Sequence, residues 1–315
     1  MRRAQGFYER KAKARIASQG SCRVASLAFD FHKNLGCPNI TTNEVYYSRQ
    51  LSCFTFNDHN LGTEGVHLYF YDETEARKRA DEFCAMPYDY FVNVLPHEVE
   101  KVELFCDSCP GQNKNWSMIK FLHHMVVKEK RFSNIKISFP VRGHSYLECD
   151  RDMALVNQKA KVEVPDDWKL VYTSARRNPS PYHVVTMTGT AFLNIASHIK
   201  SHYKTACPVQ TRPLKEVTFS KAHPQLIQYR DSWNGPFLSS HIIKQTGQKQ
   251  RAVQTGLASL YRERLPIKKA KFDDLQKLKR FCSPSSMHFF DNLPHVNSPD
   301  DDGDRNASDC SDIEE

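Results

Sequence analysis

The order of strand-like and helix-like segments constrains the fold of this 315-residue chain more than any other feature of its sequence. After a polar stretch at residues 1–20, three segments that are typical of β-strands come first. They are CRVASLAFD, which ends at Asp30, VYYSRQLSCFTFNDHN and GVHLYFYDE. Helical and strand-like segments alternate after them. This order predicts three antiparallel strands, followed by parallel strands that helices connect.

The later segments complete the series. We expect a helix from about Glu73, a fourth strand in KVELFCD, and a helix in NKNWSMIKFLHHMVVKEK that Asn113 or Asn115 caps. A fifth strand in NIKISFPV and a helix with Asp150 at its N-cap follow. The resulting order, βββαβαβα, is that of the ribonuclease H-like fold. We therefore predict an α/β protein with a ribonuclease H-like mixed sheet, in which the first and fourth strands are neighbours.

Pattern and composition divide the chain into four parts. We expect a polar N-terminal segment (1–20), a ribonuclease H-like domain (21–206), a C-terminal α+β extension with a small β subdomain (207–296) and an acidic disordered tail (297–315). From Asp300 onward the tail holds eight acids and one arginine, which is a net charge of −7. Because the whole chain has a net charge of +8, the part before Asp300 has a net charge of +15. A body this basic predicts a polyanionic partner such as DNA, although a merely soluble basic surface is the alternative.

Other sequence features bear on where the protein works. No run of about 18 apolar residues occurs, so we expect no membrane span. The basic N-terminus lacks the apolar region of a secretory signal. Ten cysteines scattered through the chain suit free thiols in a reducing compartment. We expect an intracellular protein, located in the nucleus with DNA as its partner, and a possible homo-oligomer.

The stretch ELFCDSCPGQNKN contains a C-x-x-C pair with three interpretations. A redox pair needs its cysteines at a helix start, whereas Pro110 and Gly111 directly after Cys109 indicate a turn. A structural zinc site needs a second close pair of ligands, which neither His123–His124 nor Cys84 offers at a familiar spacing. We therefore interpret Cys106 as a small buried hydrophobic residue.

The acids offer a stronger functional signal than the cysteines. Asp107 ends the fourth predicted strand on the face opposite Cys106, and Asp30 ends the neighbouring first strand, so their carboxylates should meet; Asp150 could complete the group. Carboxylates this close repel one another unless they are protonated or share divalent cations. Oxygen ligands suit Mg²⁺ or Mn²⁺, and two such ions support phosphodiester chemistry. Each acid also has a structural alternative as a helix cap, strand end or Asx turn.

Polar residues beside these acids are candidates for contact with nucleic acid. Gln112, Asn113, Lys114 and Asn115 follow Asp107 directly, and such side chains can bind phosphate oxygens. His144 in GHS is a candidate for positioning a nucleophile or a leaving group, with an ordinary loop histidine as the alternative.

Several motifs resemble one family. DSCPGQNKN is similar to the D-x-C-x-G-Q-N-K-N signature of the DUF7869 domain family of transposon-like multicopy proteins, and GHSYLECDRDMALV is similar to its later G-H-[ST]-x4-D element. AFDFHKNLGCPNITTNEVYYSRQL resembles the family's upstream strand with an aspartate, followed by a Tyr-Tyr-x-Arg-Gln-Leu run. LPIKKAKFDDLQKLKRF resembles its usual C-terminal segment. The resemblance covers roughly residues 20–295.

The resemblance implies a diverged ribonuclease H-like DDE transposase with Asp30, Asp107 and Asp150 as catalytic, metal-binding residues. The third acid of such enzymes is often a glutamate within a helix, so Asp152 and Glu148 stay open as alternatives to Asp150. Family members often carry an upstream cysteine-rich segment, so we expect a truncated or domesticated copy. Two functions follow: a Mg²⁺- or Mn²⁺-dependent nuclease or transposase, or a catalytically inactive nucleic-acid-binding or scaffold protein with the same fold.

Overall fold

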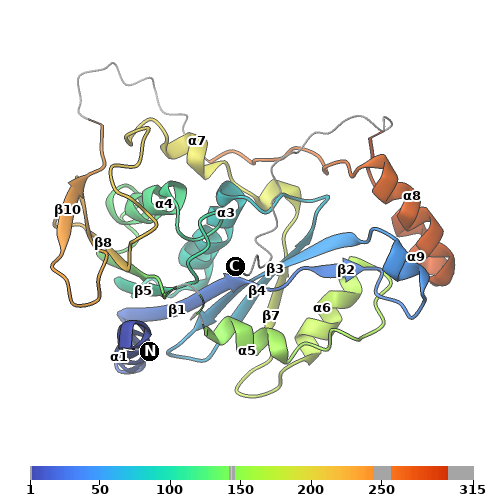
Figure 1. The fold of residues 1–315 in the computed structure, drawn as a ribbon, viewed down its shortest axis with the longest axis horizontal. Coiled ribbons are helices and arrows are strands. Elements are labelled where there is room, and N and C mark those ends of the chain that lie inside the picture. Colours follow the sequence, from blue (N-terminus) through green and yellow to red (C-terminus); the bar gives the residue numbers. More distant parts are fainter. Residues whose placement is uncertain (1, 142, 144–145, 245–256, 297–315) are drawn as a thin grey trace.

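One open, mixed β-sheet forms the centre of the computed structural model, which describes residues 2–141, 143, 146–244 and 257–296 (Figure 1). The strands follow the order β10-β9-β8-β6-β5-β1-β3-β4-β7, and β2 pairs with β3. Their bounds are β1 (Val24–Phe31), β2 (Leu35–Cys37), β3 (Leu51–Asn60), β4 (Val66–Asp72), β5 (Lys101–Phe105), β6 (Asn134–Ser138), β7 (His183–Thr186), β8 (Glu216–Ser220), β9 (Leu226–Arg230) and β10 (Leu238–His241). The expected α/β class with a mixed sheet is confirmed.

Strand directions agree with the order of the sequence patterns. β3 is antiparallel to both β1 and β4, whereas β1, β5 and β6 run parallel to one another. A short connection joins β3 to β4, but helices lie between β4, β5 and β6, as parallel pairing requires. The predicted neighbourhood of the first and fourth predicted strands, β1 and β5, is therefore confirmed.

Helices cover both faces of the sheet (Figure 1). α3, α4 and α7 lie on one face, and α1, α5 and α6 lie on the other, while α8 and α9 lie at one end. The helices are α1 (Arg2–Gln19), α2 (Glu44–Tyr47), α3 (Ala80–Asp89), α4 (Trp116–Val127), α5 (Glu148–Ala154), α6 (Pro165–Ser174), α7 (Ile195–Ile199), α8 (Lys269–Leu278) and α9 (Pro284–Asp291), with the π-helix η1 (Tyr90–Val94) and the 3₁₀-helices η2 (Gly189–Ala191) and η3 (Lys279–Phe281). No helix among the described residues is both long and apolar enough to cross a membrane.

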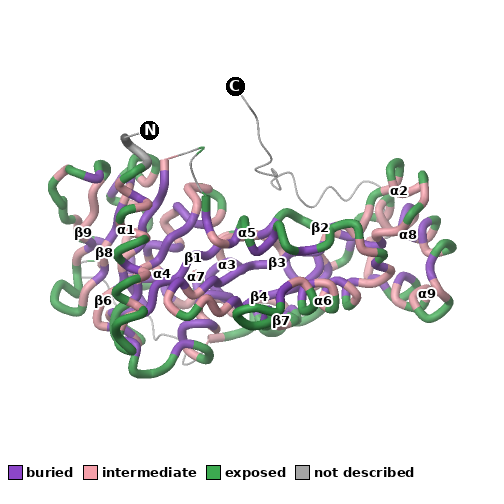
Figure 2. The backbone as a smooth tube through the Cα atoms, turned by 90° about the horizontal axis from the view of Figure 1, so that it is seen from below, coloured by how far each residue is buried: buried purple, intermediate pink, exposed green. Residues whose placement is uncertain are grey.

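The core explains this layering. Leu27 of β1 and Leu104 of β5 are in register and lie in the large cluster that also contains residues of α3 and α4. The next register pair, Ala28 and Phe105, points to the other face and packs with Phe7 of α1. Because side chains alternate between faces, β1 and β5 are buried on both sides. Figure 2 shows the central strands buried between helices with exposed outer surfaces.

Some predicted elements need correction. The helix expected from about Glu73 begins at Ala80, because Glu73 and Glu75 bind the backbone nitrogens of Ser52 and Gly189 instead of opening a helix. Residues 189–203 form only the short η2 and α7. The predicted cap Asn115 is confirmed, since its side chain accepts from the Met118 nitrogen.

Asp150 is not the N-cap that we expected. α5 begins at Glu148 with Leu147 as its N-cap, and Asp150 occupies the third helical position. Its Oδ2 accepts a hydrogen bond from the Leu147 nitrogen at 2.9 Å. The acid therefore satisfies a backbone donor at the helix start from inside the first turn.

The strands expected as a small β subdomain extend the main sheet. β8 pairs antiparallel with β6, and β9 and β10 follow it at that edge. The domain boundary at residues 206 and 207 stays a prediction, while the strands on its far side share a sheet with β1. The acidic tail at residues 297–315 lies outside the described residues.

The contact of α1 with the loop after β9 gives a first testable prediction. A Cβ added at Gly6 would lie 2.8 Å from Cγ of Trp233, a side chain that also packs against Phe7. In an open helix, Gly→Ala stabilises by about 1 kcal/mol. Here we expect Gly6→Ala to destabilise the fold by about 1–3 kcal/mol, as overpacking does. Urea unfolding measures this difference.

The matched control is Gly20→Ala at the other end of α1. The closest atom to a Cβ at Gly20 is the Ile16 carbonyl oxygen at 3.5 Å, an ordinary contact. A Gly6→Ala protein that is as stable as the Gly20→Ala protein would show that α1 does not pack on Trp233.

Candidate functional site

The carboxyl ends of β1 and β5 bring Asp30 and Asp107 together. The last register pair of these parallel strands is Ala28 with Phe105, and each aspartate lies two residues further along the chain. Alternate residues face the same side, so both aspartates lie on the face that α1 and α5 cover. Burial raises the pKa of Asp30 well above its usual value, and the charge of Asp107 is the next cause. The two acids therefore repel each other across neighbouring strands.

Asp150, an exposed residue of α5, acts on this pair through its charge. Its charge raises the pKa of Asp30 and of Asp107, in each case after the larger effect of burial. The two alternative third acids are engaged elsewhere. Asp152 accepts from His59 Nδ1 at 2.7 Å, and Glu148 is ion-paired at 2.9 Å with Lys11 and Arg15 of α1. Asp150 is thus the candidate whose charge acts on the pair.

Each of the three carboxylates uses one oxygen for the fold. Asp30 Oδ1 accepts from the Phe31 nitrogen at 2.8 Å, and Asp107 Oδ1 accepts from the Cys109 nitrogen at 3.1 Å and from Asn113. The second oxygen of each acid accepts no hydrogen bond from the described residues. The structural alternatives, such as the Asx turn of Asp107, are therefore present on one oxygen of each acid.

The donor chemistry suits a hard divalent cation, but a complete ligand cage is not assembled. Carboxylate oxygens are the ligands that Mg²⁺ and Mn²⁺ prefer. Within residues 2–141, 143, 146–244 and 257–296, no group of three or more His, Cys, Asp or Glu side chains lies close enough to hold a metal ion. Asp30 and Asp107 form the close pair, and Asp150 acts on them by its charge.

Lys78 is a site residue that the sequence did not reveal. It comes from the segment between β4 and α3, and its charge lowers the pKa of both Asp30 and Asp107 against the dominant effect of burial. Its Nζ donates to Asn34 Oδ1 at 3.0 Å and lies 4.4 Å from the ring centroid of Phe31. No local pattern marks this lysine, because only the tertiary fold brings it to the end of β1.

The four candidates for nucleic-acid contact are mostly committed to internal bonds. Asn113 is buried and donates to Asp107, and Asn115 caps α4. Lys114 is buried and donates to the Arg212 carbonyl at 2.8 Å, and burial, followed by the charge of Lys215, lowers its pKa to about 8. Gln112 is half-buried, with no side-chain hydrogen bond to the described residues. Contact of these residues with nucleic acid stays a prediction.

The cysteine interpretation and the histidine candidate have different outcomes. Cys106 is fully buried in the core with residues of α4, so its predicted packing role is confirmed. Burial, and then the charge of Asp107, raises the pKa of its thiol. Cys109 is half-buried in the turn before α4. His144 lies outside the described residues.

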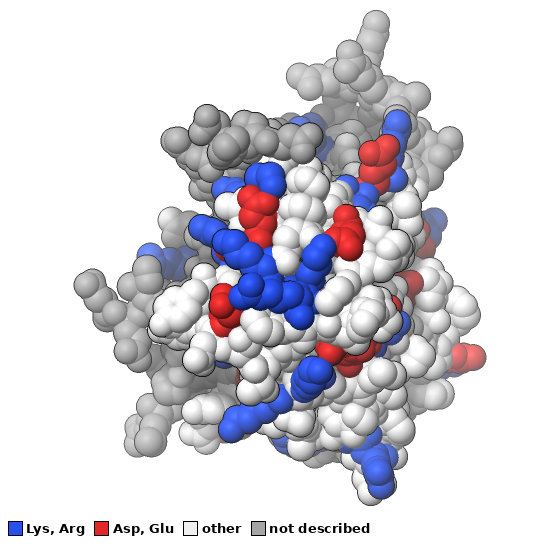
Figure 3. Space-filling model, turned by 90° about the vertical axis from the view of Figure 1, so that its right-hand side faces the viewer, with Lys and Arg blue, Asp and Glu red and all other residues white. Residues whose placement is uncertain are grey.

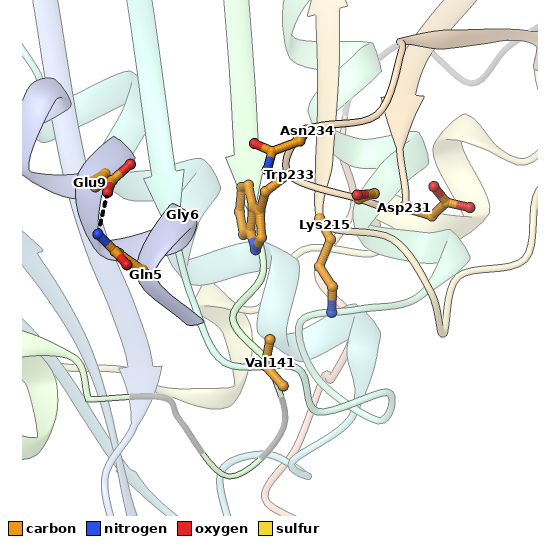
Figure 4. A pocket seen from close by; sticks show the side chains of 9 residues that line it. Gln5, Gly6, Glu9, Val141, Lys215, Asp231, Trp233 and Asn234 are labelled. Atoms are coloured by element: carbon orange, nitrogen blue, oxygen red, sulfur yellow. Dashed lines mark hydrogen bonds between the residues drawn. The ribbon is translucent and has the colours of Figure 1, made fainter. Parts of the chain in front are cut away.

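A hollow of about 820 Å³ lies beside this sheet edge, between the start of α1 and the loop after β9 (Figure 4). Figure 4 shows Trp233 and Lys215 pointing toward Val141 across it. Ser108, next to Asp107, donates to the Pro140 carbonyl at 2.9 Å, directly before Val141. None of the three acids lines the hollow, whose walls carry charges of both signs. Its lining residues are Gln5, Gly6, Glu9, Val141, Lys215, Asp231, Ser232, Trp233 and Asn234.

Comparisons with known proteins give one match. Residues 90–216 match the family model described as "Domain of unknown function (DUF7869)". This stretch is about two fifths of the 315 residues and includes Asp107 and Asp150, whereas Asp30 lies outside it. The match supports the resemblance to that domain family over this stretch. No curated protein and no solved structure matches the chain.

The repulsion among the acids predicts how stability depends on pH. Because the pKa of Asp30 is higher in the folded than in the unfolded protein, its contribution is most favourable below the ordinary value of 3.8 and is lost as the pH rises through the folded pKa. Asparagine mimics the neutral acid and keeps Oδ1. We expect Asp30→Asn to raise the melting temperature by a few degrees near neutral pH, and the gain to vanish near pH 3.8. Thermal melts with a chelator present measure both.

Asp166→Asn is the control, because the Asp166 side chain is 81% exposed and belongs to α6 rather than to the ends of β1 and β5. It should not gain stability at neutral pH. An Asp30→Asn protein that melts at or below the wild-type temperature at neutral pH would refute the repulsion among the acids.

Proposed function

We propose that the chain carries a transposase-derived, ribonuclease H-like core that cleaves or joins phosphodiester bonds, with divalent cations held by Asp30, Asp107 and Asp150. The main support is the juxtaposition of Asp30 and Asp107 on neighbouring parallel strands, with Asp150 on the helix after β6 acting on both. The strand order β6-β5-β1-β3-β4 with β3 antiparallel agrees with that fold.

The surrounding residues would prepare the acids for this task. Asn113 and the Cys109 nitrogen hold Asp107 through Oδ1, and the capping bond to Leu147 orients Asp150. Lys78 offsets part of the negative charge. A bound Mg²⁺ or Mn²⁺ would activate a water or a 3′-hydroxyl of the DNA as the nucleophile and would stabilise the leaving oxygen. The protein's own part is to hold two carboxylates in fixed positions with one oxygen of each available.

DNA is the proposed substrate, and the nucleus is the proposed location. The part of the chain before Asp300 carries a net charge of +15, which favours a polyanionic partner. A catalytically inactive nucleic-acid-binding protein is the second candidate. The absence of a three-ligand group among the described residues favours it, as does the structural bond of Asp150 in its own helix. Metal binding and cleavage distinguish the two candidates.

The first test uses Asp107→Asn. Because this acid would hold the cation, the variant should lose stabilisation by Mn²⁺, which for one site is about 2.7 kcal/mol at a hundredfold excess over Kd. It should also lose cleavage of supercoiled DNA. Thermal melts with and without Mn²⁺, together with a gel assay of cleavage, measure both effects.

Cys109→Ser is the matched control two residues away and should keep both properties. If Cys109→Ser loses the metal response and Asp107→Asn keeps it, the thiols are the ligands. The third acid is tested in the same assays. Asp150→Asn should abolish cleavage without lowering the melting temperature, because the amide oxygen can still accept from the Leu147 nitrogen and the repulsion on Asp30 and Asp107 is reduced. Asp152→Asn should lower the melting temperature because Asp152 is buried and bound to His59 and Asn57.

The second test concerns DNA binding. Contacts between a basic body and phosphates release counterions, so affinity for DNA of random sequence should fall steeply and linearly on a plot of log K against log salt. Fluorescence anisotropy with labelled duplexes of two unrelated sequences measures the slope. Affinity that does not change with salt, or no binding at low salt, would argue against both candidate functions.

A further inference from the structure

The Tyr-Tyr-x-Arg-Gln-Leu run contains two side chains that the fold leaves in solvent. Tyr46 and Tyr47 of α2 are 85% and 82% exposed, and their rings contact each other edge to face at 5.1 Å. The end of the run has structural roles, because Gln50 donates to the Pro38 carbonyl and Leu51 is fully buried. Tyrosines are enriched at interaction surfaces, and two adjacent exposed rings are typical of one.

Exposed cations come from the run itself and from the elements that are ion-paired with it. Arg49 and Lys277 have side chains 62% and 63% exposed, and both pair with Asp274, whose side chain is only 12% exposed. Arg280 is 59% exposed and pairs with Glu44. Three exposed cations thus face two carboxylates, one of them mostly covered. Figure 3 shows lysines and arginines gathered on the side of the molecule where α8 and α9 lie.

The tyrosines and the cations belong to one continuous surface. The ion pair of Arg280 with Glu44 at 3.1 Å joins η3 to the start of α2, and that of Arg49 with Asp274 at 2.8 Å joins the end of the run to α8. The guanidinium of Arg280 also lies over the half-exposed ring of Phe281, 4.8 Å from its centroid. We call this the tyrosine–arginine surface; it consists of Tyr46, Tyr47, Arg49, Lys277, Arg280 and Phe281.

We propose that the tyrosine–arginine surface binds an unpaired stretch of nucleic acid. Bases stack on exposed aromatic faces, and arginines and lysines beside them bind the phosphates. A duplex hides the faces of its bases, so this combination favours a single strand. The surface lies at the end of the molecule that carries α2 and α8, away from α5 and its acid (Figure 2). The inference rests on the proposed nucleic-acid partner and not on catalysis by the acids.

The experiment compares two labelled probes by fluorescence anisotropy. One is an oligothymidylate of about 15 nucleotides, within the site size of small single-strand-binding domains, and the other is a blunt-ended, fully paired duplex of equal length. Tyr46→Ala with Tyr47→Ala should weaken binding of the single strand roughly five- to a hundredfold for each stacked base and leave the duplex nearly unaffected. Tyr46→Phe with Tyr47→Phe should retain wild-type affinity, because phenylalanine still stacks. Asp107→Asn should bind the single strand like wild type, which separates this surface from the acids.

Several outcomes would overturn the inference. Unchanged single-strand affinity in the double alanine variant would exclude the surface, and equal loss for both probes would assign the tyrosines to general backbone binding. Loss in the phenylalanine variant would assign binding to the hydroxyls rather than to stacking. A change of sedimentation coefficient in the alanine variant, with single-strand binding intact, would make the occupant a second copy of this chain. Thermal melts confirm that each variant is folded, as expected for exposed side chains.

Discussion

The parallel pairing of β1 with β5 is the constraint on which the rest of the structure depends. Its register places Leu27 and Leu104 in the core beneath α3 and α4, and Ala28 and Phe105 in the core beneath α1. A shift of one residue in this pairing would turn each side chain of β5 to the opposite face of the sheet, so Leu104 and Phe105 would pack against the wrong helices. The same register carries the chain to Asp30 and Asp107, so the packing of the core and the repulsion of the acids have one origin.

The contacts of Asp152 and Glu148 on the α1 and α5 face show why Asp150 is the candidate for the third acid. Burial alone would raise the pKa of Asp152, but hydrogen bonds from His59 and Asn57 lower it below its usual value. Glu148, at the start of the same helix, is held by Lys11 and Arg15 of α1. Removing His59, the partner of the buried Asp152, would cost several kcal/mol. The acids on either side of Asp150 therefore anchor α5, and Asp150 acts on Asp30 and Asp107 through its charge.

Sequence patterns predicted the strands well because burial on both faces leaves continuous apolar runs such as that of β1. The patterns gave wrong predictions where a charged side chain could either begin a helix or bind a residue distant in the sequence. Glu73 looked like a helix start, but the fold gives it Lys271 and the Ser52 nitrogen. Lys78 could not be found, because its neighbours Asn34 and Phe31 are more than 40 residues away in the chain. The pairing of β8 with β6 could not be predicted either, because the alternation of apolar and polar residues in a strand does not specify which edge of a sheet that strand joins.

The acids and the tyrosine–arginine surface are linked through one segment of chain. β1 ends at Phe31, directly after Asp30, and the chain then passes through β2 and α2 before it enters β3 at Leu51. β2 is held against β3 by its pairing of Leu35 with Cys53, and Arg49 is held to α8 through Asp274. Both ends of the segment are thus fixed to the sheet or to a helix. A nucleic-acid strand bound on the tyrosines would therefore contact a part of the molecule whose position relative to Asp30 is set by the sheet itself. The positive charges that would attract its phosphates belong to the tyrosine–arginine surface and not to the site of the repelling acids.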